Sequence, residues 1–179
     1  MRKEISWDEY YLNICRAVGT KSHCHSRQIG SVMVKDNVII STGYNGPARG
    51  IPECRLRLHR DSYINKKLLE TYTEDDITTM YNNYTCPRKA LGFKSGEGLE
   101  FCNAVHSEKN CLLSAARLGI ATKGATIYID AEISPCTQCY SACIQAGIKE
   151  IVVVKNNIYD PSLEYCIEYG KLSIREFDI

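Results

Sequence analysis

The sequence predicts an α/β protein in which helices cover a single mixed sheet. Three observations indicate this fold class: helical periodicity near the N-terminus, a hairpin pattern directly after it, and alternating helix and strand patterns in the second half. A chain of 179 residues suffices for one domain with a full core, and 44% hydrophobic with 24% charged residues is typical of globular proteins. We therefore expect one domain over residues 1–179.

The first predicted elements are a helix and a hairpin. Residues 7–18 show helical spacing of apolar side chains, with Ser6 as a suitable N-cap and Gly19 as a stop. The apolar positions are Trp7, Tyr10, Tyr11, Ile14, Cys15 and Val18. Two apolar runs around KDN in residues 29–46 predict a β-hairpin, and GYNGP at its end predicts a sharp loop.

Residues from about 48 to 100 show weak periodicity and many polar side chains, so we interpret them as an insertion that lacks a core of its own. After the insertion, three helix patterns alternate with three strand patterns, which brings the expected sheet to five strands. The expected helices cover 107–119, 136–147 and 161–170, and the expected strands cover 125–130, 150–155 and 171–177.

Charge and composition exclude several classes of partner. A net charge of +1 provides no global attraction for a polyanion, so we expect no nucleic-acid partner. No stretch approaches the roughly 20 apolar residues of a membrane helix, and no signal-peptide core is present, so we expect a cytoplasmic protein without a membrane partner. In a reducing compartment, ten cysteines favour metal binding, catalysis or burial over disulfides.

A glutamate in the helix at 107–119 lies where an apolar side chain is expected. Glu108 belongs to the stripe that should face the core, and a carboxylate there is costly unless it is paired or functional. The stripe continues through Cys111, Leu112, Ala115 and Leu118. We therefore expect Glu108 to be catalytic, as a group that takes and gives protons.

His106, Cys136 and Cys139 supply three ligands for a tetrahedral zinc ion with a fourth position for water, which is the pattern of catalytic zinc. The two cysteines lie three residues apart at a helix N-terminus, which points both sulfurs one way and favours thiolates. Alone, the histidine is more simply a helix cap or a surface residue, and the cysteine pair is more simply a structural half-site or a redox pair. Together, H-x-E followed by P-C-x-x-C is typical of zinc-dependent nucleobase deaminases.

Longer blocks of the chain resemble the deoxycytidylate (dCMP) deaminase family of the cytidine deaminase superfamily. The blocks are WDEYYLNICRAV, RQIGSVMVKDNVIISTGYNGPARG, NAVHSEKN, GATIYI and SPCTQCYSACIQAGIKEIVVV. The resemblance implies a three-layer α/β/α cytidine-deaminase-like fold with a central mixed five-stranded sheet. It also implies a hydrolase that converts dCMP to dUMP and ammonia with catalytic Zn²⁺, supplying dUMP for thymidylate synthesis.

The resemblance also implies substrate contacts. Asn45 would meet the sugar hydroxyl, and the backbone at Ala104 and Val105 would line the base pocket. We expect Arg27 to bind the phosphate, because a guanidinium fork matches phosphate oxygens. The simpler alternatives are a turn asparagine at 45 and a solvated charge at a strand edge at 27.

Four further cysteines lie in or beside the insertion, where family members often carry a second, structural zinc. They are Cys24, Cys54, Cys86 and Cys102. Nearby histidines at 23, 25 and 59 can replace one of them, Glu53 stands where the family usually has a histidine, and thiols without metal are the alternative. The remaining cysteines fall on apolar helix faces and are interpreted as core residues: Cys15, Cys111, Cys143 and Cys166.

Many relatives are hexamers that dCTP with Mg²⁺ activates and dTTP inhibits. The resemblance therefore implies a homo-oligomer with an allosteric site, to which Gly46 and Arg117 are expected to contribute. Other hypotheses remain open: a free cytidine deaminase, a tRNA adenosine deaminase, a pterin- or pyrimidine-pathway deaminase, and a non-catalytic zinc-binding module.

Overall fold

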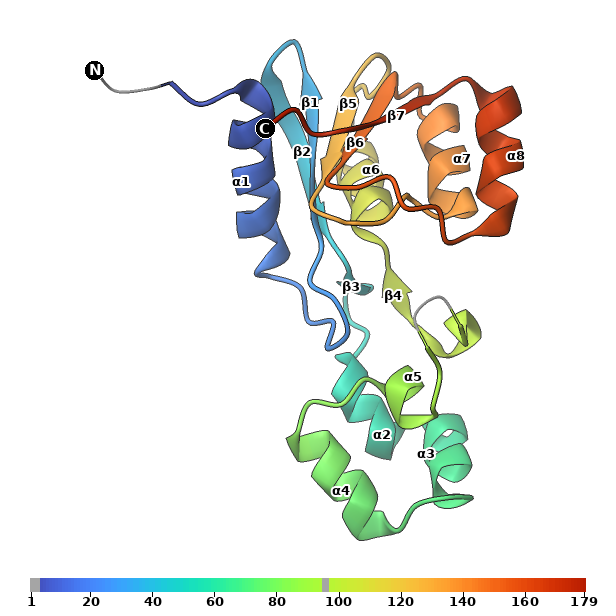
Figure 1. Cartoon of the computed structure of the whole chain (residues 1–179). Helices are drawn as coiled ribbons and strands as arrows, with labels where there is room; N and C mark the ends of the chain where they lie inside the picture. The colour runs from blue at the N-terminus through green and yellow to red at the C-terminus, as the bar shows by residue number, and fades with distance from the viewer. Residues whose placement is uncertain (1–3, 95–96) are drawn as a thin grey trace. The chain divides into compact units, whose positions relative to one another are not determined.

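The computed structural model describes residues 4–94 and 97–179, which form two compact units (Figure 1). Unit 1 comprises the described residues up to Ser22 together with Ile29–Asn45 and His106–Ile179, and unit 2 comprises His23–Gln28 and Gly46–Val105. The insertion expected at about 48–100 lies within unit 2. That the whole chain acts as one deaminase domain remains a prediction.

Unit 1 is built on a five-stranded mixed sheet, as predicted. The strand order is β2–β1–β5–β6–β7. Strand β1 is antiparallel to both of its neighbours, whereas β5, β6 and β7 run parallel to one another. The strands are β1 (Gly30–Lys35), β2 (Val38–Tyr44), β5 (Thr126–Ile129), β6 (Glu150–Val153) and β7 (Ser173–Glu176).

Strands β1 and β2 form the predicted hairpin. Asp36 and Asn37 between them have φ angles of 51° and 60°, and two consecutive positive φ angles are what a tight two-residue hairpin turn requires. Further along the hairpin Ser31 pairs with Gly43, and a Cβ on this glycine would collide with the backbone of the following helix at Ser107. The glycine therefore allows that helix to lie directly on the hairpin.

Helices cover both faces of the sheet, so unit 1 has three layers (Figure 1). On one face, Tyr11 and Cys15 of the N-terminal helix pack against Val32. The other face holds the larger core, in which Met33 and Ile127 of the sheet join apolar residues of the remaining helices. The helices are α1 (Trp7–Gly19), α6 (Ser107–Arg117), α7 (Thr137–Gln145) and α8 (Pro161–Gly170).

Most helix ends follow their sequence signals. Ser6 caps α1 by accepting a hydrogen bond from the Glu9 amide at 3.1 Å. Gly119 and Gly147 follow α6 and α7 with φ angles of 68° and 72°, which a glycine adopts without strain.

One expected core position, Leu118, was wrong, and two residues of the apolar pattern in α1 lie at the surface. Trp7 and Tyr10 are 57% and 42% exposed, and they pack against the ring of Tyr11. Leu118 is 67% exposed because it is the C-cap of α6, where the helical path that carries the buried stripe has ended.

Unit 2 consists of short helices, helical turns and a two-stranded ribbon, and it has a core of its own. The expectation that the insertion lacks a core was wrong: Leu58, Ile64, Leu68 and Ile77 are fully buried against one another. Each helix supplies only one or two of these residues, too few for a visible period. The elements are β3 (Gly46–Pro47), η1 (Cys54–Leu56), α2 (Arg57–Arg60), α3 (Ser62–Leu69), α4 (Glu74–Asn82), α5 (Pro87–Ala90), η2 (Leu99–Phe101) and β4 (Ala104–Val105).

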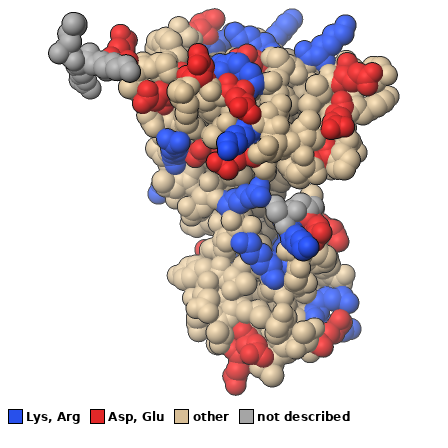
Figure 2. All heavy atoms as spheres, viewed as in Figure 1, with Lys and Arg blue, Asp and Glu red and all other residues tan. Residues whose placement is uncertain are grey.

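The length and polarity of the described helices, and the charges on one face of the molecule, agree with the nearly neutral, globular composition. Among the residues that the structure describes, no helix is both long and apolar enough to cross a membrane. Figure 2 shows Lys and Arg side chains interspersed with Asp and Glu side chains on the face drawn. That face therefore offers no uniformly basic surface of the kind that binds nucleic acid through its phosphates.

Candidate metal centre and active site

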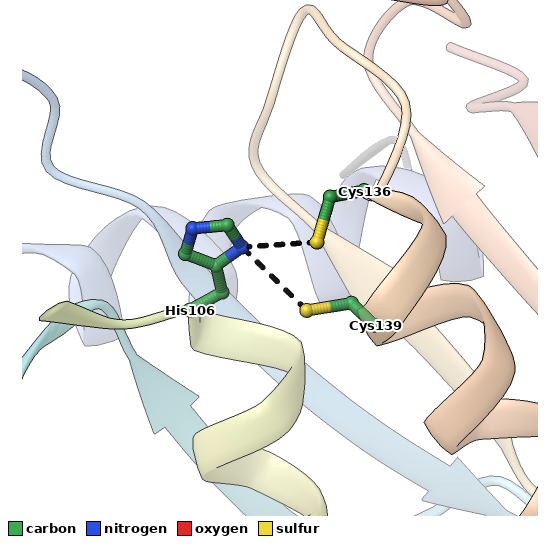
Figure 3. Close-up of side chains that lie close together, drawn as sticks. All are labelled: His106, Cys136 and Cys139. Atoms are coloured by element: carbon green, nitrogen blue, oxygen red, sulfur yellow. Dashed lines mark hydrogen bonds between the residues drawn. The ribbon is translucent and has the colours of Figure 1, made fainter. Parts of the chain in front are cut away.

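Three predicted metal ligands meet at the N-termini of two helices of unit 1. His106 is the N-cap residue of α6, Cys136 is the N-cap residue of α7, and Cys139 lies in the first turn of α7. Nδ1 of His106 lies 3.5 Å from the sulfur of Cys136 and 3.5 Å from that of Cys139, with the ring edge turned toward both (Figure 3). Cys139 is buried, while the other two side chains are half-buried.

The spacing of these atoms fits a tetrahedral zinc ion. With Zn–S bonds near 2.3 Å and Zn–N bonds near 2.05 Å, a nitrogen and a sulfur at two tetrahedral corners lie roughly 3.6 Å apart. The observed 3.5 Å separations match this value, and all three ligand atoms lie within 4.8 Å of one another. The residues present therefore fit zinc, and Nδ1 is the histidine nitrogen that faces the sulfurs.

The three side chains are also linked electrostatically. A hydrogen bond from Cys139 lowers the pKa of Cys136 to about 4, with a further contribution from His106, although burial opposes the shift. The same pairing raises the pKa of Cys139, and the bond with Cys136 raises the pKa of His106. The lowered pKa favours the thiolate of Cys136, which is the form that binds metal.

Glu108 lies beside this triad in the first turn of α6. Its side chain is buried, with 5% of its surface exposed, and Oε2 accepts a hydrogen bond from Ser107 Oγ at 3.1 Å. Its charge helps to raise the pKa of both Cys139 and His106. A buried carboxylate next to a metal-ligand set is placed to exchange protons with a molecule bound there.

The loop that carries the cysteines is held by residues that follow β6. Asp160 Oδ2 accepts a hydrogen bond from the Thr137 amide at 2.8 Å, so this carboxylate caps α7. Ser134 Oγ donates to Asn156 Oδ1 at 2.8 Å, and the Ser134 amide donates to the Asn157 carbonyl at 3.0 Å. These contacts fix the approach to Cys136, and sequence spacing gave no indication of them.

Tyr159 is a further residue that sequence reasoning missed. Burial raises the pKa of its phenol, and the charges of Cys136, Glu108 and Cys139 add to the shift, which places the hydroxyl near the triad. The residue is still 37% exposed, so its ring belongs to the surface around the site. A tyrosine in an irregular segment before α8 carries no sequence signal of this proximity.

The predicted substrate contacts are distributed over both units. Asn45 in unit 1 is buried, and its Oδ1 accepts hydrogen bonds from Ser22 Oγ at 2.7 Å and the Ile29 amide at 2.8 Å. Arg27 in unit 2 is exposed. Ala104 and Val105 form strand β4, also in unit 2, and are half-buried.

The residues expected at the allosteric site also divide between the units. Gly46 belongs to the short strand β3 of unit 2, where it pairs with Val105. Arg117 is exposed in the last turn of α6 in unit 1. The contacts that these residues are expected to make with nucleotides remain predictions.

The four cysteines expected at a second zinc site all belong to unit 2. Burial raises the pKa of Cys54 to about 12, and the charges of Cys24, Cys102 and Cys86 add to the effect, so the four thiols lie in one neighbourhood. Within the described part of the chain, however, a set of three ligand atoms closer than 4.8 Å occurs at His106, Cys136 and Cys139 and not among these four.

The site and its surroundings match a known protein family. Residues 5–155 match the family described as "Cytidine and deoxycytidylate deaminase zinc-binding region". The chain belongs to this deaminase family. The matched segment contains all three ligands of the triad and Glu108.

Individual relatives agree with this assignment. The chain is 33% identical to the deoxycytidylate deaminase of Enterobacteria phage T4, covering 89% of the chain and 77% of that protein. It is 28% identical to the deoxycytidylate deaminase of Schizosaccharomyces pombe, covering 96% of the chain but 44% of that protein, so it spans less than half of this relative's length.

Solved structures of the family share the fold. The structure of dCMP deaminase from the cyanophage S-TIM5 in complex with dCMP and dUMP matches with a TM-score of 0.62 at 18% identity, covering 98% of the chain and 99% of that protein. The mixed five-stranded sheet with helices on both faces is therefore a cytidine-deaminase-like fold, as the sequence predicted.

Proposed function

We propose that the protein is a zinc-dependent hydrolase that converts dCMP and water to dUMP and ammonia, and thereby supplies dUMP for thymidylate synthesis. The observation that carries the proposal is the buried carboxylate of Glu108 beside three ligands at tetrahedral spacing. Support comes from relatives that are named deoxycytidylate deaminase and from the fold shared with a dCMP-bound structure.

His106, Cys136 and Cys139 would hold the zinc ion, which supplies a Lewis acid that lowers the pKa of water to near neutrality. Glu108 accepts the proton of the attacking water and delivers it to the ring nitrogen N3 of cytosine. Once the water oxygen has bonded to C4, the same carboxylate takes the second proton from the hydroxyl on C4 and passes it to the amine as the C4–N bond breaks, so that ammonia leaves and the carbonyl of uracil remains. Glu108 acts as a proton shuttle and not as a ligand.

The decisive experiment measures ammonia release from cytidine, deoxycytidine, CMP, dCMP and dCTP, with zinc counted per chain. We expect turnover of dCMP to exceed that of the other four. Glu108→Gln should keep the zinc and the melting temperature but lower kcat on the order of 10³-fold, because the amide cannot shuttle protons. Full activity of this variant would contradict the shuttle, and no turnover of any cytosine compound would favour the non-catalytic module.

Arg27 serves as the phosphate contact in this proposal, while Asn45 meets the sugar hydroxyl and the backbone at 104–105 lines the base pocket. The exposed position of Arg27 and the match of a guanidinium to phosphate geometry support this role. Arg27→Ala should raise KM for dCMP far more than KM for deoxycytidine, which has no phosphate. Equal changes for both substrates would remove the phosphate assignment and favour a free cytidine deaminase.

A second, structural zinc in unit 2 is part of the same proposal. The shared neighbourhood of Cys24, Cys54, Cys86 and Cys102 supports it. Nε2 of His25 is also buried with no hydrogen-bond partner among the described residues, so this histidine is an alternative ligand. Two zinc ions per chain in the wild-type protein are the expected result.

Regulation and assembly complete the proposal and rest on the family resemblance. We expect a cytoplasmic homo-hexamer that dCTP with Mg²⁺ activates and dTTP inhibits, with Gly46 and Arg117 at the effector site. Titration of either triphosphate into a dCMP assay tests the regulation, and an unchanged rate with both would remove it. Light scattering tests the assembly.

A further inference from the structure

Two buried serine hydroxyls connect the central sheet to Glu108. Ser31 Oγ donates to Ser107 Oγ at 2.6 Å, and Ser107 Oγ donates to Glu108 Oε2 at 3.1 Å. All three side chains are buried, with 0%, 1% and 5% of their surface exposed. A carboxylate can only accept hydrogen bonds, so the Ser107 hydroxyl donates its proton to Glu108. The Ser31 hydroxyl in turn donates its proton to Ser107 Oγ.

Ser31 occupies a position that the sheet otherwise fills with apolar side chains. Successive residues of a strand face opposite sides, and Met33, two residues later, belongs to the core beneath α6 and α7. A fully buried hydroxyl on this face is costly unless it is hydrogen-bonded. The bond to Ser107 provides that partner, which gives the serine a specific reason to be there.

The backbone brings the two serines together. Ser31 pairs across the hairpin with Gly43, and the absence of a side chain at this glycine allows the Ser107 carbonyl of α6 to lie against the sheet. Both serines and Glu108 belong to unit 1, so the chain of hydrogen bonds runs within one compact body. Helix α6 is thus fixed to the sheet at its first turn, which carries Glu108.

We propose that Ser31 and Ser107 are positioning residues that hold the Glu108 carboxylate in one orientation beside the metal ligands. The proposal rests on the function proposed above, because it assigns the two hydroxyls to the proton shuttle. Ser107 fixes one carboxylate oxygen directly, and Ser31 acts through Ser107 by orienting its hydroxyl. A shuttle that is misdirected by about 1 Å transfers protons poorly even when its substrate still binds.

Kinetics of alanine variants test this assignment. Ser107→Ala should lower kcat for dCMP by about 10- to 100-fold, the effect of one hydrogen bond to a charged group, with KM and the zinc count unchanged. Ser31→Ala should lower kcat by a smaller factor. The double variant should be no slower than Ser107→Ala, because Ser31 acts only through Ser107.

Ser41→Ala is the matched control. Ser41 also lies on the hairpin and bonds to α6, through the Cys111 carbonyl at 2.8 Å, but it has no bond to Glu108. This variant should keep the wild-type kcat. A wild-type kcat in Ser107→Ala, losses that multiply in the double variant, or an equal loss in Ser41→Ala would each overturn the proposal.

Crystal structures of the zinc-loaded variants separate this proposal from the proposed function. In Ser107→Ala we expect the Glu108 carboxylate to occupy more than one orientation while His106, Cys136 and Cys139 stay in place. If the wild-type protein does not deaminate dCMP but this disorder is seen, the positioning role stands and the function falls. If dCMP is deaminated and the carboxylate of the variant stays fixed, the function stands and the positioning role falls.

Discussion

The two units both gather cysteines, but they arrange them differently. In unit 1, the ligands lie at the N-termini of α6 and α7, which are 11 and 9 residues long and pack on a five-stranded sheet, and Nδ1 of the histidine is 3.5 Å from each sulfur. In unit 2, the helices are 4 to 9 residues long and the cysteines share a neighbourhood without forming such a set. Rigid elements thus preorganise one site, whereas the other depends on short segments.

Removing a ligand from the preorganised site should give the largest effect. In Cys136→Ala we expect activity on dCMP to fall on the order of 10³-fold or more and zinc to fall by one ion per chain, because two ligands hold the metal poorly. The melting temperature should change little, since the sheet core does not include Cys136. Activity assays, metal analysis and thermal unfolding measure the three quantities.

Cys143→Ala is the control for that variant. Cys143 lies about two turns beyond Cys136 along α7 and is fully buried in the core, but it belongs to no ligand set among the described residues. The control should keep its zinc and most of its activity. Equal zinc loss in both variants would mean that metal content reports the packing of α7 and not ligation.

Cys54→Ala tests the other side of the comparison. We expect the zinc count to fall from two to one and unit 2 to become sensitive to protease, because short helices with a small core depend on a metal for stability. Limited proteolysis followed by mass spectrometry should place the new cuts within residues 46–105. One zinc per wild-type chain, with unchanged proteolysis of the variant, would show that unit 2 is stable on its own.

The same contrast explains how much of the molecule the sequence could predict. In unit 1, long periodic segments define the elements, and the motif spacing identified His106, Glu108 and the cysteine pair. In unit 2, Ile77 is the one buried residue of its nine-residue helix, so the small core could not be recognised from periodicity.

The supporting residues of the site were hidden for a different reason. Ser31 lies among apolar residues of β1, where a serine by itself carries no signal of a function. Its partner Ser107 is 76 residues away in the chain. Tyr159 and Asp160 reach the site from an irregular segment. Side-chain contacts of this kind depend on tertiary packing, which local patterns do not encode, whereas metal ligation restricts residue types and spacing enough to be read.

Core truncations should have a moderate effect that differs between the units. Ile127→Ala in β5 and Ile77→Ala in α4 each remove a fully buried side chain and should each cost about 2–4 kcal/mol. We expect Ile127→Ala to lower the protection of the whole sheet in hydrogen exchange and Ile77→Ala to lower protection in unit 2 alone. Loss of protection in both units for both variants would show that they unfold as one body.

The smallest effect concerns an ion pair that joins the two ends of unit 1. Asp8 in α1 accepts hydrogen bonds from Arg175 of β7 at 2.5 and 3.1 Å and from the Asp178 amide at 2.8 Å, and the C-terminus lies beside α1 (Figure 1). Burial alone would raise the pKa of Asp8, but these bonds and the charge of Arg175 outweigh it and lower the pKa below 3.8. Asp8→Asn should cost about 2 kcal/mol near neutral pH, a fall of roughly 4–8 °C in Tm.

The sign of the pH dependence follows from the lowered pKa. A carboxylate that titrates lower in the folded than in the unfolded protein stabilises the fold above its ordinary pKa of 3.8, and this stability is lost as the pH falls through the folded-state value. The difference in Tm between the wild type and Asp8→Asn should therefore be constant from pH 7 to 5 and shrink below pH 4. Glu70→Gln in unit 2 is the control, because its pair with Lys67 is exposed and should contribute little at any pH. A difference for Asp8→Asn that persists at pH 2 would mean that packing of the side chain, and not its charge, joins α1 to β7.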